Sequence, residues 1–443
     1  MASIPPVKGT RDLYPEDYAP IRRIFDVWRD VSVRHGFEEF EGPTLEYLEL
    51  YREKSGDELV GQLYLLTDSG GRELALRPEM TPTLARMVAA RVHALSKPIK
   101  WFCIPTLFRG ENVQRGRLRE FFQWNVDVIG TADVVGDAEV ILVGVEALRE
   151  LGLAASDFAV HISNRRLMAA LLSALGIAEN RHGAAYGILD KFGKLPAEEF
   201  DRRWGEAFAD AVGAAPLRAL MAATSPADVG SAVRASGGRV SEALEAAIDE
   251  TGRLVSILAD FGITEFCKFD LRVVRGLAYY TGPVFEFYDR SEAERAICGG
   301  GRYDDLLGKL GKSKEPAVGF GMGDVVLSLV LADRGLLQSR EADSPVYVVG
   351  GGQTGPSTLH RVVGLLRRAG IRAEFGYRPQ ALNKQLKAAD KRGARQVVIL
   401  AADDLPAGRV RIRQLSGPDA GRQREVSLDE LAADPCQALR GDR

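Results

Sequence analysis

Apolar residues recur every three or four positions between residues 17 and 35, a spacing that predicts an amphipathic helix. Gly36 follows directly and is expected to end this helix. The apolar positions are Ile21, Ile24, Phe25, Trp28 and Val31. Farther along, the strand-like segments 62–68 and 72–78 meet at the turn signal Asp68-Ser-Gly-Gly, so they are expected to form a hairpin.

The aromatic-rich segments 99–110 and 119–130 predict two longer strands. Because the polar stretch 111–118 lies between them, a long β-hairpin with a charged loop is expected. The segment 166–252 is rich in Ala and charged residues and poor in strand patterns, which favours a helical insertion. Strand signals return near Cys267.

Strand-like and helix-like segments alternate over residues 344–443, which predicts a small α/β domain. The preceding chain is predicted to form an α+β domain, an antiparallel sheet of six strands flanked by helices. Its two parts, 1–165 and 253–332, are separated by the helical insertion at 166–252.

The length of 443 residues is enough for two or three stable cores. No stretch approaches the roughly 18 uninterrupted apolar residues of a membrane span, and the N-terminus has no apolar core like that of a signal peptide. The sequence therefore predicts a cytosolic or organelle-matrix protein. The four cysteines lie far apart and suggest neither a zinc site nor a disulfide framework: Cys103, Cys267, Cys298 and Cys436.

Charge is distributed unevenly along the chain. Residues 344–443 contain 17 Lys and Arg against 10 Asp and Glu, a balance of +7. Because the net charge of the whole chain is −3, the first 343 residues carry a charge of −10. A basic tail on an acidic body is consistent with a module that binds a polyanion. A solvated, Arg-rich surface explains the same composition equally well.

Glycine-rich segments do not match the common nucleotide motifs. GGGQTGPST lacks the Lys-Ser/Thr pair of a P-loop, and GFGMGD lacks the spacing of a dinucleotide fingerprint. The glycines of CGGGRYD and GFGMGD are instead expected to let strands approach a ligand or one another closely.

Four arginines, Arg109, Arg115, Arg117 and Arg119, are concentrated in the hairpin. The alternation of the last three is expected to place them on one side, where guanidinium groups could bind the oxygens of a polyphosphate. Phe121 could stack on a base. The alternative is a hairpin of salt-bridged arginines and core aromatics.

Five stretches together resemble one family: KGTRDLYPED, LRPEMTP, FRGEN followed by GRLREFFQWNVDVIG, VVRGLAYYTGPVFE, and CGGGRYDDL. They are similar to motifs of the histidyl-tRNA synthetases, which are class II aminoacyl-tRNA synthetases. The resemblance covers nearly the whole chain, since residues 344–443 are similar to the anticodon-binding domain of that family.

The resemblance implies ATP-dependent attachment of L-histidine to tRNA(His) through histidyl-adenylate. It implies ATP as a substrate together with Mg²⁺, no tightly bound metal or prosthetic group, and a cytoplasmic homodimer whose interface includes the first helix and the segment around Pro43.

The resemblance also assigns roles to individual residues. Arg109 would grip the α-phosphate, and Arg275 would stabilise charge there as the catalytic residue. ATP would be bound by Arg109, Glu111, Arg117 and Phe121. The acceptor end of tRNA would be bound by Gln114 and Arg115. Histidine would be bound by Glu79, Thr81, Arg109, Gln123, Asp127, Arg275, Tyr279, Tyr280 and Tyr303.

Three positions depart from the family pattern. Asp127 stands where Glu is usual, Ala278 where Asp is common, and Val326 where most class II enzymes have an arginine. Two other functions therefore stay open at this point. One is a regulatory, histidine-binding paralogue like the regulatory subunit of ATP phosphoribosyltransferase, which lacks the C-terminal domain; the other is a tRNA-sensing regulator.

Overall fold

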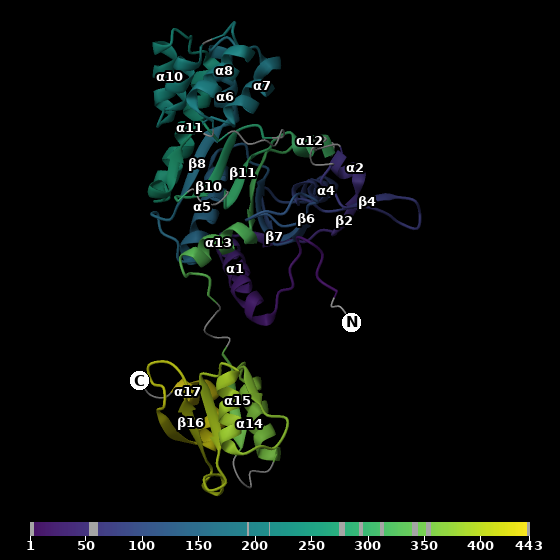
Figure 1. The fold of residues 1–443 in the computed structure, drawn as a ribbon, viewed down its shortest axis with the longest axis vertical. Coiled ribbons are helices and arrows are strands. Elements are labelled where there is room, and N and C mark those ends of the chain that lie inside the picture. The colour runs from purple at the N-terminus through teal and green to yellow at the C-terminus, as the bar shows by residue number, and fades with distance from the viewer. Residues whose placement is uncertain are drawn as a thin grey trace. The chain divides into compact units, whose positions relative to one another are not determined.

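The chain folds into two units, Met1–Gln338 and Ser339–Arg443 (Figure 1). The computed structural model describes residues 4–52, 61–192, 195–211, 213–273, 280–291, 296–310, 314–338, 344–350 and 356–440. No helix in these ranges is long and apolar enough to cross a membrane.

The first unit is organised around a mixed sheet in the order β1-β5-β7-β12-β11-β10-β8-β9, with β6 paired to β7. The strands, in chain order, are β1 Glu38–Glu39, β5 Ile99–Cys103, β6 Thr106–Phe108, β7 Glu120–Ile129, β8 Phe158–Asn164, β9 Cys267–Phe269, β10 Pro283–Asp289, β11 Cys298–Arg302 and β12 Ala317–Gly323. The six strands from β5 to β8 along this order pair antiparallel, as predicted. The edge strands β1 and β9 add parallel pairs.

The helix expected at 17–35 is α1, Pro15–Arg34, and it packs on the sheet through its apolar side. Trp28 is fully buried and stacks on Trp124 of β7, with ring centroids 5.7 Å apart. The indole nitrogen of Trp124 donates to Ser32 Oγ (3.0 Å), which ties the helix to the strand. Gly36, at a φ of +76°, follows the helix in the left-handed region that glycine tolerates.

Helices cover the two faces of this sheet. On one face α1, α5 (Val135–Glu150) and α13 (Asp324–Asp333) enclose the main core, to which β7 contributes Val126 and Val128. The alternation of a strand points Asp127 and Ile129 to the other face. There α4 (Thr81–Arg91) and α12 (Leu306–Leu310) form a smaller core around Ile129.

A small sheet and a helical segment complete the first unit. The sheet has the order β2-β4-β3, and its strands are β2 Leu45–Tyr47, β3 Leu65–Thr67 and β4 Glu73–Leu76. The short helix α2, Leu48–Arg52, follows β2. The predicted hairpin is the β3–β4 pair, and Asp68 Oδ1 accepts from the backbone N–H groups of Gly70 (2.9 Å) and Arg72 (3.0 Å) in its turn. The helices are α6 Arg165–Ala174, α7 His182–Leu189, α8 Ala197–Ala207, α9 Ala214–Met221, α10 Pro226–Ala235 and α11 Glu242–Asp260, and they share a core of their own.

The second unit has the predicted α/β alternation. Its sheet has the order β14-β13-β15-β16-β17, parallel among the first three strands and antiparallel among the last three. The elements are β13 Val346–Gly350, α14 Pro356–Arg368, β14 Ala373–Phe375, α15 Leu382–Lys391, β15 Gln396–Leu400, β16 Arg409–Gln414, β17 Gln423–Ser427, α16 Leu428–Ala433 and α17 Pro435–Arg440.

His35, the residue after α1, is held by two carboxylates of α5. Its Nδ1 lies 3.3 Å from Glu139 and its Nε2 lies 3.0 Å from Glu146; Lys100 Nζ also donates to Glu139 (2.8 Å). The hydrogen bond with Glu139 is the largest cause that raises the pKa of His35 above its ordinary value, and burial opposes it. A raised folded pKa means that the stabilisation is complete below the unfolded pKa of about 6.5 and is lost as the pH rises through the folded pKa.

We therefore expect wild type to exceed His35→Gln in Tm most strongly near about pH 6, because the ion pairs exist only while the imidazole is protonated. The difference in Tm should be about 2 to 4 °C at that pH, since such a pair contributes about 1 kcal/mol. At about pH 9, where the imidazole is neutral, the difference should be smaller. Thermal unfolding followed by circular dichroism measures it. Arg29→Gln is the matched control: Arg29 of the same helix pairs with Glu39 (2.8 Å), which is not a partner of His35, and stays charged, so its effect should be constant over this range. An effect of His35→Gln that is equal at both pH values would contradict the assignment.

Candidate active site

A cavity of about 180 Å³ lies on the sheet where β7, β11 and β12 run side by side. Phe121 and Gln123 of β7 line it, together with Gly299 of β11 and Gly321 of β12. The hairpin loop before β7 adds Arg109, Glu111 and Arg117, and the start of α13 adds Val325 and Val326. Two guanidinium groups and an aromatic ring therefore meet in one hollow.

Glycines of β12 make room for the polar side chains of β7. A Cβ atom at Gly319 would stand 1.9 Å from Asp127 Oδ1, and one at Gly321 would stand 2.8 Å from Gln123 Cδ. Gly319 is the direct register partner of Asp127, whereas Gly321 pairs with Asn125 and lies diagonally across from Gln123. The close approach expected of the glycine-rich segments is thus confirmed for β12, where it opens the face that carries Asp127 and Gln123.

Arg109 connects the hairpin to the LRPEMTP loop. Its Nε donates to the carbonyl oxygen of Pro78 (2.9 Å), and its guanidinium carbon lies 5.2 Å from the centroid of the Phe121 ring. The buried carboxylate of Glu79 follows Pro78 directly, and half-buried Thr81 begins α4. The loop therefore brings Glu79 and Thr81 close to the cation that the resemblance assigns to the α-phosphate.

The expectation that Arg115, Arg117 and Arg119 share one side of the hairpin is wrong. Gln114 and Arg117 close a tight turn through paired backbone hydrogen bonds, with Gly116 at a φ of +75°. Because this turn interrupts the alternation, the exposed Arg115 reaches Asp333 of α13 (3.4 Å), whereas Arg117 forms an ion pair with Glu111.

Arg119 also turns toward Glu111. Its Nε donates to the backbone carbonyl of Glu111 (3.2 Å), and its backbone N–H donates to the carbonyl of Gly9 (2.9 Å). The alternative of a salt-bridged hairpin therefore describes part of the loop correctly. Exposed Gln114 and Arg115 remain at the loop tip, outside the cavity lining.

Asp127 lies in a second, more buried group of polar side chains. Its carboxylate accepts a hydrogen bond of 2.5 Å from the hydroxyl of Tyr303, and both side chains are almost fully buried. Tyr280, also buried, packs over Gly301, where an added Cβ would stand 3.0 Å from its ring. Arg275 and Tyr279 lie outside the described residues, so their predicted roles stay predictions.

The start of α13 is fixed by a buried carboxylate. Asp324 Oδ1 accepts from the backbone N–H of Phe122 (2.9 Å), and its Oδ2 accepts from Arg11 (2.7 Å). Burial raises the pKa of Asp324, and the nearby Arg11 guanidinium opposes that shift. Val326, two residues on, presents an apolar side chain to the cavity at the position where a cation was expected.

Comparison with known proteins identifies the family. Residues 9–323 match the family model described as histidyl-tRNA synthetase, and residues 346–434 match the one described as anticodon binding domain. The chain belongs to the histidyl-tRNA synthetase family. The first unit accordingly has a class II synthetase-like fold, and the second is an anticodon-binding domain.

Individual relatives agree with this family over most of their length. The chain is 41% identical to the histidine–tRNA ligase of Opitutus terrae over 94% of this chain and 95% of that protein. It is 37% identical to the histidine–tRNA ligase of Thermoplasma volcanium over 96% of each. The crystal structure of histidyl-tRNA synthetase from Nostoc sp. PCC 7120 superposes with a TM-score of 0.83 at 26% identity, covering 97% of this chain and 98% of that one.

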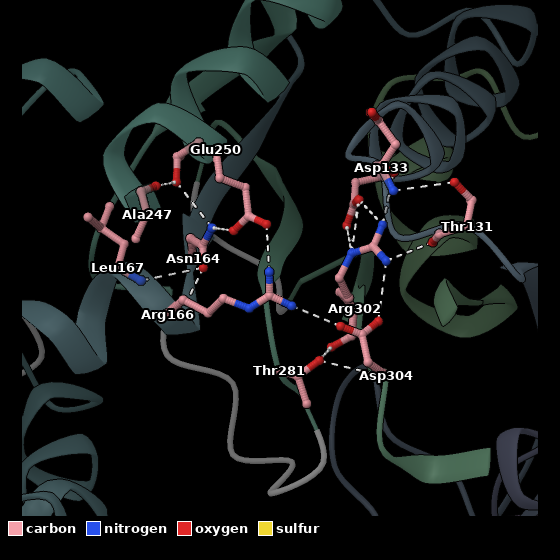
Figure 2. A network of polar contacts seen from close by, with 12 residues as sticks. Thr131, Asp133, Asn164, Arg166, Leu167, Ala247, Glu250, Thr281, Arg302 and Asp304 are labelled. Carbon is pink, nitrogen blue, oxygen red and sulfur yellow. Dashed lines mark hydrogen bonds and ion pairs between the residues drawn. The ribbon is translucent and has the colours of Figure 1, made fainter. Parts of the chain in front are cut away.

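A polar network beside the site escaped the sequence reasoning (Figure 2). Arg302, the last residue of β11, is fully buried and binds the buried carboxylate of Asp137 on α5. Its neighbour Asp304 binds Arg166 of α6 (2.9 Å). The signal available in the sequence was the charged pair in GGGRYDDL directly after three glycines, but its partners are more than a hundred residues away and have no local pattern.

Proposed function

We propose that the cavity on β7, β11 and β12, together with the buried polar group around Asp127, activates L-histidine with ATP, and that the chain then transfers the histidyl group to tRNA(His). The chain is a histidine–tRNA ligase: the family match spans both units, and the curated relatives of that name cover nearly the whole sequence. The observation that carries the assignment of chemistry is the pairing of Arg109 and Phe121 in one cavity, with Asp127 on the same face of β7 as Gln123.

In the first step an oxygen of the histidine carboxylate attacks the α-phosphorus of ATP, and pyrophosphate leaves. Negative charge accumulates on the α-phosphate oxygens during this attack, so a fixed guanidinium lowers the barrier more than it strengthens ground-state binding. Arg109 suits this role because its hydrogen bond to Pro78 and its contact with Phe121 hold it in place. Arg275 is proposed as the second such cation.

The base and the outer phosphates of ATP would be bound by the remaining cavity residues. Phe121 offers a ring face for stacking on adenine, and Glu111 offers acceptor oxygens for its amino group. Arg117 is proposed to bind the outer phosphates, which requires it to leave its ion pair with Glu111. Class II synthetases use ATP together with Mg²⁺, and we propose that the ion enters with the nucleotide and offsets the loss of the cation replaced by Val326.

In the second step a terminal ribose hydroxyl of tRNA attacks the carbonyl carbon of the histidyl-adenylate, and AMP leaves. Gln114 and Arg115 are exposed at the tip of the hairpin loop, where a bulky acceptor end can reach them. We propose that they contact this end. The basic second unit is proposed to bind the anticodon region, since the balance of +7 over residues 344–443 favours a polyanion.

Imidazole recognition is proposed to depend on Asp127 with Tyr280 and Tyr303. A neutral imidazole has one N–H donor and one acceptor nitrogen, so a carboxylate and a hydroxyl complement it. The Tyr303 hydroxyl already donates to Asp127, which fixes the orientation of that carboxylate. The histidine amino group would be bound by Glu79, Thr81 and Gln123.

The regulatory alternatives are not favoured. Close relatives named as ligases span both units, and the C-terminal domain missing from the regulatory paralogue is present. A cytoplasmic location remains a prediction from the class of the relatives.

We propose that the chain forms a homodimer through the segment that includes Pro43 and the first helix. An exposed apolar surface on the small sheet supports this. Leu45, Tyr47 and Leu66 are 44%, 53% and 44% exposed. Leu74 and Leu76, their register partners on β4, continue the same face. Apolar surface gathered in this way is typical of an interface.

Asp127→Ala should raise the Michaelis constant for histidine by about 10-fold or more, because an imidazole N–H left unpaired in a buried pocket costs about 1 to 3 kcal/mol. The Michaelis constant for ATP should stay within about 2-fold, since Asp127 is outside the cavity lining. Histidine-dependent ATP–pyrophosphate exchange measures both. Asp127→Glu, which restores the residue usual in the family, should retain substantial activity. Unchanged histidine kinetics in Asp127→Ala would show that Asp127 is structural.

Removal of the second unit should separate the two steps. A chain ending at Gln338 should retain histidine-dependent pyrophosphate exchange and lose most of its charging of tRNA(His), because the anticodon contacts are gone. In the full chain, added salt should weaken tRNA binding far more than histidine binding, since counterion release scales with the number of phosphate contacts. Full charging by the shortened chain would contradict the proposed role of the second unit.

Replacing Leu45 and Leu66 together by Asp should convert the protein to monomers, because two carboxylates would have to be buried in an apolar interface. Light scattering coupled to size-exclusion chromatography gives the mass. The control is Tyr377→Asp, because Tyr377 is an exposed residue of the second unit; no change in mass is expected for this variant. A double variant that stays dimeric would place the interface elsewhere.

A further inference from the structure

Asp304 contacts Thr281, Arg302 and, from the helical segment, Arg166 (Figure 2). Its backbone N–H donates to Thr281 Oγ1 (3.1 Å), and the backbone N–H of Thr281 donates to the carbonyl of Arg302 (2.7 Å). Tyr280 directly precedes Thr281, and Tyr303 directly precedes Asp304. The hydrogen bonds of this short ladder therefore set the separation of the backbones that carry the two tyrosines.

The carboxylate of Asp304 is in turn held from three sides. Its Oδ1 accepts from Arg302 Nη1 (3.2 Å) and from the backbone N–H of Ala317 (3.3 Å), and its Oδ2 accepts from Arg166 Nη2 (2.9 Å). Arg302 and Ala317 belong to the same sheet as the pocket. Arg166 is the partner that comes from the helical segment, at the start of α6.

Arg166 is itself fixed in position by that segment. Asn164 caps α6 by accepting from the backbone N–H of Arg166 (2.9 Å) and donates through Nδ2 to Glu250 of α11 (2.8 Å). The same carboxylate accepts from Arg166 Nη1 (2.6 Å). One guanidinium thus spans Glu250 on α11 and Asp304 beside the pocket.

We propose that Arg166 is a positioning residue for histidine recognition, which acts through Asp304 and links α11 to the pair Tyr280 and Tyr303. This inference rests on the proposed function of the pocket. Arg166 is 45% exposed in its side chain, so its ion pairs contribute little to global stability. Its effect is therefore expected on the geometry of the pocket, which tolerates little displacement.

Arg166→Ala should raise the Michaelis constant for histidine in pyrophosphate exchange by about 5- to 10-fold, with the constant for ATP within about 2-fold and Tm within about 2 °C. Arg166→Lys should recover part of the loss, because an ammonium can still reach one carboxylate. The matched control is Arg253→Ala. Arg253 also joins α11 to the rest of the unit, through the carboxylate of Asp133 (3.0 Å). The network that holds Asp304 contacts Asp133 only at its backbone carbonyl, through Arg302 (3.2 Å), so loss of the Arg253 ion pair should leave both constants unchanged.

A double-mutant cycle tests the route through Asp304. Arg166→Ala combined with Asp304→Asn should weaken histidine binding no more than the stronger single change, since both remove the same link. Additive losses, equal effects of Arg253→Ala, or an unchanged histidine constant in Arg166→Ala would overturn the proposal.

Failure of the proposed function would look different. In that case the wild type shows no histidine-dependent exchange, and titration calorimetry with L-histidine replaces the kinetics. A loss of histidine affinity in Arg166→Ala but not in Arg253→Ala then supports the positioning role, and equal affinities overturn it.

Discussion

The site depends on the contact of β7 with a strand that has almost no side chains on the functional face. Gly319 and Gly321 of β12 leave the space that Asp127 and Gln123 of β7 occupy. A sheet with ordinary side chains on both strands would fill this face with apolar groups and close the cavity. The functional face therefore exists because one strand supplies only backbone while its neighbour supplies the chemistry.

Local patterns predicted the fold well. The 3.6-residue period of α1, the turn at Asp68, and the strand–helix alternation of the second unit each depend on residues close in sequence, and the structure confirms them. The strand signal near Cys267 is confirmed by β9, but the parallel pairing of the edge strands β1 and β9 was not predicted, because each has only two or three residues and pairs with a strand distant in sequence.

The site was predicted less completely. The stretches that resemble the family contain Arg109, Phe121 and Asp127, and the structure brings these onto one hairpin and one sheet face. The position of Arg115 was predicted wrongly, because a tight turn at Gly116 overrides the alternation of an extended strand. The contact of Arg166 with Asp304 spans 138 positions, so it follows from tertiary packing rather than from any local spacing.

The ion pair between Arg117 and Glu111 affects how pyrophosphate is released. A guanidinium that already holds a carboxylate can receive a phosphate only by giving up that partner, so the net gain is the difference between two charge-assisted contacts. Under the role proposed for Arg117, the Glu111 carboxylate acts as an internal competitor, which limits how tightly the outer phosphates are retained. When pyrophosphate leaves the cavity, the Glu111 carboxylate would replace it as the partner of Arg117. This replacement would favour product release and therefore turnover.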